Sequence, residues 1–344
     1  MEKQVFGTTQ YGQEVNLYRM ANENGMVVKI LNYGGIIVGL EVPDVNGKME
    51  DVVLGYDTLL EYEQNPGFFG AIVGPSANRI GKATFVIDGI SYQVDANENG
   101  NNLHSHFELG FHKQIWEVEE GHNELLLTLH CKDGELGFPG NRKITTKYTL
   151  TEDNALIITY DAISDANTLM NLTNHTYFNL SGGGSIENHN LCLHASYYTP
   201  VHSDCIPTGE IASVQNTPFD FRNLHKVGDE INSEHEQIQI GSGYDHNFCI
   251  DHADGSLQEF GYVLDCSSGR VMVMETDLPG VQLYTGNFIA EEVGKSGRLY
   301  GKQMGFCFET QFYPNAINED DFPDVICGPQ QPYHSVTSYR FTTQ

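Results

Sequence analysis

Two short segments of the sequence carry acid–base side chains in a strand-like pattern. In the stretch LTNHTYFNL (172–180), alternate positions place four polar residues on one face: Thr173, His175, Tyr177 and Asn179. The opposite face is apolar at both ends, and a period of two is typical of a strand with one packed side. We therefore predict a strand here, with His175 in the wall of a site.

The second segment is FCFETQF (306–312), where Glu309 alternates with phenylalanines at 306, 308 and 312. A carboxylate opposite such an apolar face is held by a rigid element, as a catalytic base must be. The alternative for Glu309 is a solvent-facing side chain. The alternative for His175 is a core histidine whose ring bonds to a neighbouring hydroxyl. With reference pKa values of ~6.5 and ~4.3, His175 and Glu309 could together supply an acid and a base near neutral pH.

Further polar motifs could bind hydroxyl groups. Asn78 and Arg79 of ANRI (77–80) offer donors, and Asp245 of GYDHNF (243–248) lies between aromatic residues, as suits a carboxylate that accepts bonds from sugar hydroxyls. A surface arginine and a turn aspartate are the alternatives. His104, His106 and Glu108 form H-x-H-x-E, which on a strand could hold a metal ion; a histidine-bearing loop is the alternative.

The elements that must position these residues read mainly as strands. Runs rich in β-branched and aromatic residues recur at 26–31, 83–88, 124–131, 144–150 and 155–161, and the polar residues 151–154 predict a hairpin between the last two. Helical patterns are short, at 58–64 and 223–233. We expect an all-β fold, a large antiparallel β-sandwich with few short helices, formed by residues 1–344 as a single domain.

The composition limits the partners. A formal net charge of −28 opposes nucleic acid, anionic membranes and phosphorylated substrates, and favours a small neutral ligand. Seven widely spaced cysteines include no CxxC pair, and the first residues lack the apolar run of a signal peptide. We expect free thiols, no membrane partner and a cytoplasmic location.

Six motifs in one order carry a resemblance to a known family. ANRI, NNLH followed by GFHKQIW, LTNHTYFNL, GYDHNF, QLYTGNF and FCFETQFYPNAIN together resemble the aldose 1-epimerase (galactose mutarotase) family over nearly the whole chain. The resemblance implies the β-sandwich of that family, without metal or organic cofactor, and an isomerase that interconverts the α and β anomers of free aldohexoses such as galactose and glucose. It implies a monosaccharide as the partner of a monomer or homodimer.

The resemblance also implies roles for residues of this sequence. Glu309 would be the base and His175 the acid, and the residues that hold the sugar would be Asn78, Arg79, His104, Thr176, Tyr177, Asp245 and Gln282. The chain departs from the family pattern in the loop 105–110, where His106 replaces a glycine and could narrow the cleft. Three other interpretations stay open: a non-catalytic carbohydrate-binding relative, a phosphosugar epimerase, and a metal-dependent β-barrel enzyme that uses His104, His106 and Glu108.

Overall fold

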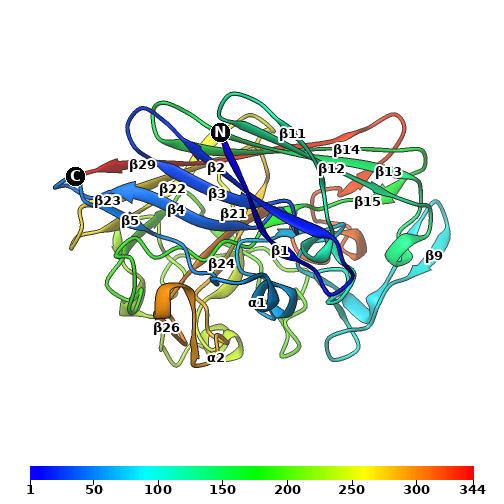
Figure 1. Cartoon of the computed structure of the whole chain (residues 1–344). Helices are drawn as coiled ribbons and strands as arrows, with labels where there is room; N and C mark the ends of the chain where they lie inside the picture. Colours follow the sequence, from blue (N-terminus) through cyan, green and yellow to red (C-terminus); the bar gives the residue numbers. More distant parts are fainter.

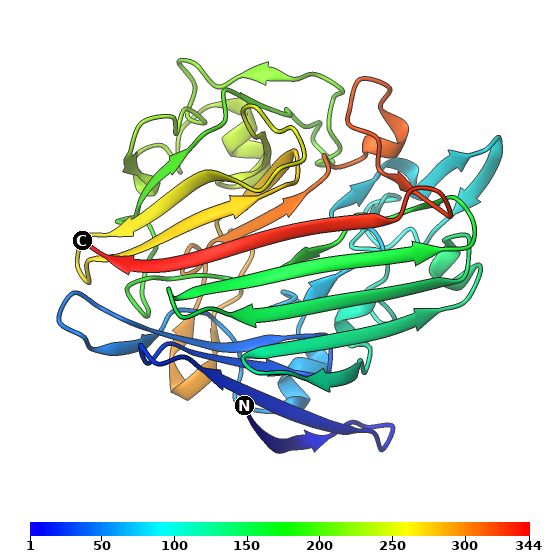
Figure 2. The same ribbon diagram turned by 90° about the horizontal axis from the view of Figure 1, so that it is seen from above.

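A nine-stranded antiparallel sheet is the largest element of the computed structural model, which describes residues 1–344. In spatial order its strands are β11 (Glu117–Glu120), β12 (Glu124–Cys131), β13 (Arg142–Leu150), β14 (Ala155–Ser164), β29 (Tyr333–Thr343), β23 (Arg270–Thr276), β22 (Gln258–Asp265), β17 (Asn190–Leu193) and β20 (His225–Lys226). The predicted hairpin is β13–β14, whose turn is closed by Thr151 through bonds with Ala155. Figure 2 shows this sheet face-on, with β29 in red crossing the view.

Two five-stranded antiparallel sheets lie on one side of the large sheet (Figure 1). One contains, in order, β1 (Glu2–Thr8), β2 (Glu14–Ala21), β3 (Val27–Leu31), β4 (Ile37–Pro43) and β5 (Met49–Asp51). The other contains, in order, β19 (Ala212–Ser213), β18 (Tyr197–Tyr198), β21 (Asp245–Cys249), β24 (Gly280–Tyr284) and β27 (Cys307–Gln311). The predicted antiparallel β-sandwich is thus confirmed.

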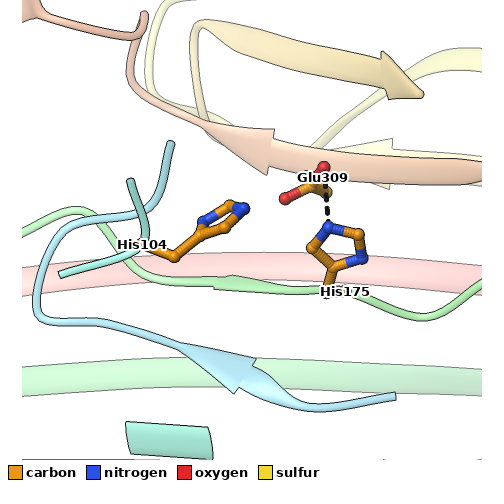
Figure 3. Close-up of side chains that lie close together, drawn as sticks. All are labelled: His104, His175 and Glu309. Atoms are coloured by element: carbon orange, nitrogen blue, oxygen red, sulfur yellow. Dashed lines mark ion pairs between the residues drawn. The ribbon is translucent and has the colours of Figure 1, made fainter. Parts of the chain in front are cut away.

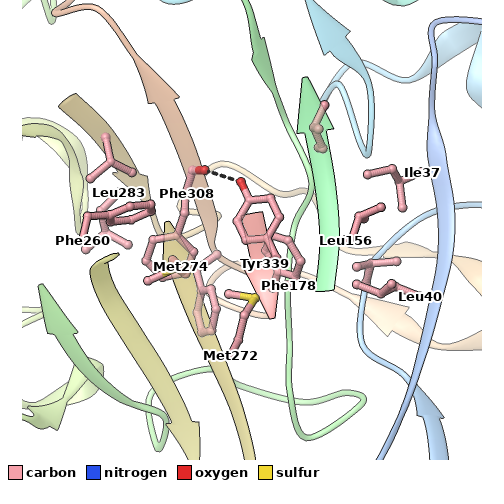
Figure 4. Close-up of a cluster of buried hydrophobic side chains, with 14 of the residues drawn as sticks. Ile37, Leu40, Leu156, Phe178, Phe260, Met272, Met274, Leu283, Phe308 and Tyr339 are labelled. Carbon is pink, nitrogen blue, oxygen red and sulfur yellow. Dashed lines mark hydrogen bonds between the residues drawn. The ribbon is translucent and has the colours of Figure 1, made fainter. Parts of the chain in front are cut away.

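The main core fills the space between the large sheet and both smaller sheets (Figure 4). Leu156, Met272, Met274 and Tyr339 of the large sheet, Ile37 and Leu40 of β4, and Leu283 and Phe308 of β24 and β27 belong to one cluster of 53 buried residues. Tyr339 also donates its hydroxyl to the backbone oxygen of Phe308, at 2.9 Å. Because strand side chains alternate between faces, burying Phe308 turns its neighbour Glu309 to the opposite face of β27.

Two short helices connect the strands. Helix α1 (Leu59–Gln64) is capped by Thr58, which forms a capping box with Glu61, so the prediction at 58–64 is confirmed. Helix α2 (Glu236–Gly241) lies beyond the second predicted helix, and the prediction at 223–233 is wrong. There the chain adds β20 to the edge of the large sheet and then makes a single 3₁₀ turn, because pairing with β17 outweighs the local helical pattern. Neither helix has the length and apolar character needed to cross a membrane.

Five pairs of short strands complete the architecture. They are β6 (Ile72–Val73) with β16 (Thr173–Asn174), β7 (Arg79–Ile80) with β10 (Asn102–Leu103), β8 (Thr84–Ile87) with β9 (Ile90–Gln93), β15 (Thr168–Leu169) with β28 (Ile326–Cys327), and β25 (Glu292–Val293) with β26 (Leu299–Tyr300). The first two pairs carry residues that the sequence singled out.

The predicted strand over 172–180 is only partly correct. Regular strand pairing covers only β16, because its partner strand β6 is two residues long. After β16 the segment forms only isolated bridges, from Phe178 to Val53 and to Phe306. The alternation survives in this extended segment: Leu172, Phe178 and Leu180 enter the core, while His175 and Tyr177 face a cavity. The segment crosses from one strand pair to another and still presents its histidine on the predicted face.

Candidate active site

A cavity of about 280 Å³ collects most of the singled-out residues. Its lining contains seven of the nine predicted site residues: Asn78, Arg79, His104, His175, Tyr177, Asp245 and Glu309. Thr176 and Gln282 do not line it. Thr176 donates its hydroxyl to Asn174, and Gln282 donates its amide to Asp245 at 2.7 Å, so Gln282 supports a lining residue from behind.

Glu309 reaches the cavity from the rigid sheet. On β27 it is paired with Gln282 of β24, and Asp245 projects from the same face of β21, two strands away. Only 2 % of Glu309 is exposed, so the solvent-facing alternative is wrong. Its Oε2 atom is buried and has no hydrogen-bond partner within the protein, which leaves a strong acceptor free for a ligand.

His175 is held opposite Glu309 by backbone bonds and aromatic packing. Its amide donates to the oxygen of Ala71, and its own oxygen accepts from Gly70. Gly70 has φ +72°, and a Cβ there would lie 2.3 Å from the oxygen of Ile37, so this turn requires glycine. The rings of Phe68 and Tyr177 stack against the imidazole, at 5.9 and 4.9 Å between centroids.

The imidazole and the carboxylate face each other across the cavity floor (Figure 3). His175 Nε2 lies 3.7 Å from Glu309 Oε1. Burial lowers the pKa of His175 to about 4. Burial, together with the charge of Asp245, raises the pKa of Glu309 well above its usual range, while Arg79 lowers it. Because a buried site disfavours each separate charge, the pair is suited to keep and exchange a single proton near neutral pH.

His104 completes the cluster as a hydrogen-bond donor. The Asn78 amide donates to His104 Nδ1 at 3.1 Å, and the His104 amide donates back to the Asn78 oxygen. Burial, followed by the charges of His175 and Arg79, lowers the pKa of His104, so the ring is neutral and its proton lies on Nε2. That Nε2–H group points toward Glu309 and His175 in Figure 3.

This tautomer bears on metal binding. Ligand atoms of His104, His175 and Glu309 lie within 4.8 Å of one another. A metal ion would have to bind His104 through Nε2, but the bond from Asn78 to Nδ1 leaves the proton of the neutral ring on Nε2, where it blocks the metal. The proposed trio of His104, His106 and Glu108 is not formed. The left-handed backbone at His104 and the following serine breaks the strand geometry, and His106 Nδ1 instead accepts the amide of Glu108. His106 does not line the cavity, so it does not narrow it.

Arg79 is buried, which overturns the surface alternative. The short pair β7–β10 sets Arg79 opposite Leu103, next to His104. Its guanidinium binds the carboxylate of Glu98 at 2.6 and 3.0 Å. Burial acts to lower the pKa of Arg79, but the bonds with Glu98 and the charge of Asp245 outweigh it and raise that pKa above its ordinary value.

Sequence reasoning missed several lining residues. Tyr284 lies two positions after Gln282, so strand alternation could have placed it on the site face. Cys307, which alternation does place on the same face of β27 as Glu309, does not line the cavity. The Cys307 sulfur lies 3.4 Å from His175 Nδ1. Glu98, Phe288 and other residues of the cavity wall lie on loops, and no local pattern marks them.

A buried acid–base pair in a cavity, on the face of a sandwich sheet, defines this chain as an enzyme-like β-sandwich. Residues 16–340 match the family model described as aldose 1-epimerase. The chain is 41 % identical to human galactose mutarotase over 320 residues, covering 92 % of this chain and 91 % of the relative. It is 32 % identical to the aldose 1-epimerase of Escherichia coli, covering 97 % of each.

The solved structures agree. An aldose epimerase homologue from C. elegans superposes with a TM-score of 0.88 at 31 % identity, covering 96 % of this chain and 99 % of that one. Galactose 1-epimerase from Lactobacillus acidophilus gives 0.87 at 26 % identity, covering 99 % and 98 %. The chain belongs to the aldose 1-epimerase family.

Proposed function

We propose that the protein interconverts the α and β anomers of free aldohexoses, galactose and glucose among them, by opening and reclosing the sugar ring. The observation that carries the assignment is the buried pair of His175 and Glu309, 3.7 Å apart at the floor of a cavity lined by hydrogen-bonding groups. The two oxygens that must exchange protons in this reaction, O1 and the ring oxygen, are bonded to the same carbon. An acid and a base must therefore stand close together, as these two do.

Ring opening uses Glu309 as the base and His175 as the acid. Glu309 takes the proton of the C1 hydroxyl, the bond from C1 to the ring oxygen breaks as the C1 carbonyl forms, and His175 Nε2 gives its proton to the ring oxygen. The pair passes from imidazolium and carboxylate to imidazole and carboxylic acid. Both states hold one proton in total, so the enzyme needs no proton from outside the site.

Reclosure reverses the roles. After rotation about the bond between C1 and C2, the freed hydroxyl attacks the other face of the aldehyde, His175 recovers its proton and Glu309 returns one to O1. The raised pKa of Glu309 makes it a stronger base, and the lowered pKa of His175 makes its protonated form a stronger acid. Both shifts favour the transfers that ring opening requires.

The other polar groups orient the sugar. His104 Nε2–H and the side-chain amide nitrogen of Asn78 are donors at one wall, and Asp245, fixed by Gln282, is an acceptor at another. Arg79, although paired with Glu98, adds positive charge that stabilises the carboxylate form of Glu309. Tyr177 packs its ring against His175 and presents an apolar wall to the sugar.

The experiment is polarimetry of freshly dissolved α-D-galactose and α-D-glucose with and without the protein. We expect the protein to accelerate the approach to the equilibrium rotation for both sugars. A protein that binds galactose in calorimetry but leaves the rate of mutarotation unchanged would be a non-catalytic carbohydrate-binding relative, and the proposal would be wrong.

A further inference from the structure

The cavity contains more negative than positive charge. Arg79 is the one lysine or arginine in its lining, burial keeps His104 neutral, and the His175–Glu309 pair carries no net charge because it holds one proton. Four carboxyl groups line the same space: Glu98, Asp245, Glu292 and Glu309. Glu309 is the catalytic base, and Asp245 accepts a hydrogen bond from Gln282. Glu98 and Glu292 are neither the base nor partners of Gln282.

Glu98 occupies the side of Arg79 that would best bind an anion. Its two carboxylate oxygens accept bonds from Nε (2.6 Å) and Nη2 (3.0 Å), which is the paired geometry in which a guanidinium holds any carboxylate or phosphate. The side chains are 10 % exposed for Arg79 and 25 % for Glu98, so solvent screens the pair only in part. An anionic ligand would have to displace Glu98 to reach this fork.

The backbone fixes Glu98 in this position. The amide and oxygen of Glu98 exchange hydrogen bonds with Asn101, which closes a tight loop immediately before β10. The amide side chain of Asn101 donates to Asp204 at 3.1 Å, which places another carboxylate beside this loop. Glu98 is therefore a built-in partner of Arg79, held by the loop that precedes β10, the strand after which His104 follows.

We propose that Glu98 is a specificity-determining residue: by occupying the Arg79 guanidinium, it makes the cavity select neutral aldoses and reject aldoses that carry a carboxylate or a phosphate. The inference rests on the proposed function and names its substrate class. The remaining carboxylates repel an anionic sugar, and the one cation that could compensate is already paired. At separations within such a cavity, one unpaired charge changes binding by about tenfold or more.

The test compares two sugars that differ only at C6, D-galactose and D-galacturonate, by polarimetry at pH 7 with the spontaneous rate subtracted. For the unaltered protein we expect kcat/KM to favour galactose by at least about tenfold. Equal values for the two sugars would overturn the inference without any variant. If galactose itself is not turned over, the proposed function fails instead, so the two failures are distinguishable.

Two matched variants isolate the role of Glu98. Glu98→Gln removes a cavity carboxylate and frees the Arg79 fork, whereas Glu292→Gln removes a cavity carboxylate that is bonded to the Tyr56 hydroxyl and frees no cation. We expect the preference for galactose to fall at least about tenfold in Glu98→Gln and much less in Glu292→Gln. Equal effects of the two variants, or no effect of Glu98→Gln, would contradict the proposal.

Folding of each variant is checked by the fluorescence of Trp116, the single buried tryptophan. Glu98→Ala frees the same fork and carries the same expectation if Glu98→Gln is lost to aggregation. Because the readout is a ratio between two sugars, a general loss of activity in a variant does not obscure the result.

Discussion

The charges around Glu309 predict opposite shifts of the alkaline limb of the pH–rate profile in two variants. The His175–Glu309 pair works with one proton, and activity ends when that proton is lost as pH rises through the raised pKa of Glu309. The charge of Asp245 raises this pKa and that of Arg79 lowers it. Asp245→Asn should therefore move the alkaline limb to lower pH, and Arg79→Met should move it to higher pH.

The size of the shift follows from the strand geometry. Asp245 and Glu309 project from the same sheet face, two strands apart and offset by two residues in register. Strand spacing and rise place their carboxylates roughly 10 Å apart. With an effective dielectric constant of ~20, two unit charges at that distance interact by about 1.7 kcal/mol, or roughly one pKa unit. We expect a shift of that order in Asp245→Asn.

The assay is kcat/KM for α-D-galactose measured by polarimetry or a coupled dehydrogenase from pH 4 to 10. This parameter reports ionisations of the free enzyme, so weaker sugar binding in the variants lowers the curve without moving its limb. Unmoved limbs in both variants, or movement in the same direction, would refute the electrostatic account of Glu309.

Further predictions concern groups around the site. Burial lowers the pKa of His246 to about 3, so between pH 7 and 5 the unfolded chain binds a proton that the folded chain does not. His246 alone therefore lowers the unfolding free energy by about 2 kcal/mol as the pH falls from 7 to 5. In urea unfolding, His246→Gln should reduce the difference in unfolding free energy between pH 7 and pH 5 by that amount. An unchanged difference would contradict it. Lys295→Met leaves the Asp51 carboxylate, 2.7 Å away, without its ion pair, and should lower the unfolding free energy by about 3 kcal/mol; a loss below about 1 kcal/mol would show that water replaces the lysine. Cys307→Val removes the thiol 3.4 Å from His175 Nδ1, and we expect kcat to fall about tenfold with little change in KM, because the histidine loses a positioning contact; an unchanged kcat would assign the thiol to packing alone.

Strand alternation was sufficient to predict which face of β27 turns Glu309 toward the cavity. Phenylalanines on one face of the segment placed Glu309 on the other, and the register with β24 preserves this arrangement. The same rule placed His175 and Tyr177 together, although regular pairing stops at Asn174. The side-chain period survived there because backbone hydrogen bonds continue past β16, from His175 to Gly70 and Ala71 and from Tyr177 to Leu54.

The rest of the site depends on contacts that no local pattern encodes. The alternate spacing of His104 and His106 suggested a shared face, but two left-handed residues turn the chain between them. Glu98 pairs with a residue 19 positions earlier, because the short β7–β10 pair brings the two loops together. Such pairs form in the folded topology and leave no periodic signal in the sequence.

The most direct test of the acid–base account is the rate of α-D-galactose mutarotation by Glu309→Gln, compared with the unaltered protein and with galactose binding measured by calorimetry. Glutamine keeps the size of the side chain and its place on β27 but cannot accept the O1 proton. We predict a fall in kcat of at least ~100-fold, the scale of general base catalysis, with galactose still bound. A variant that retains the full rate would show that Glu309 is not the base.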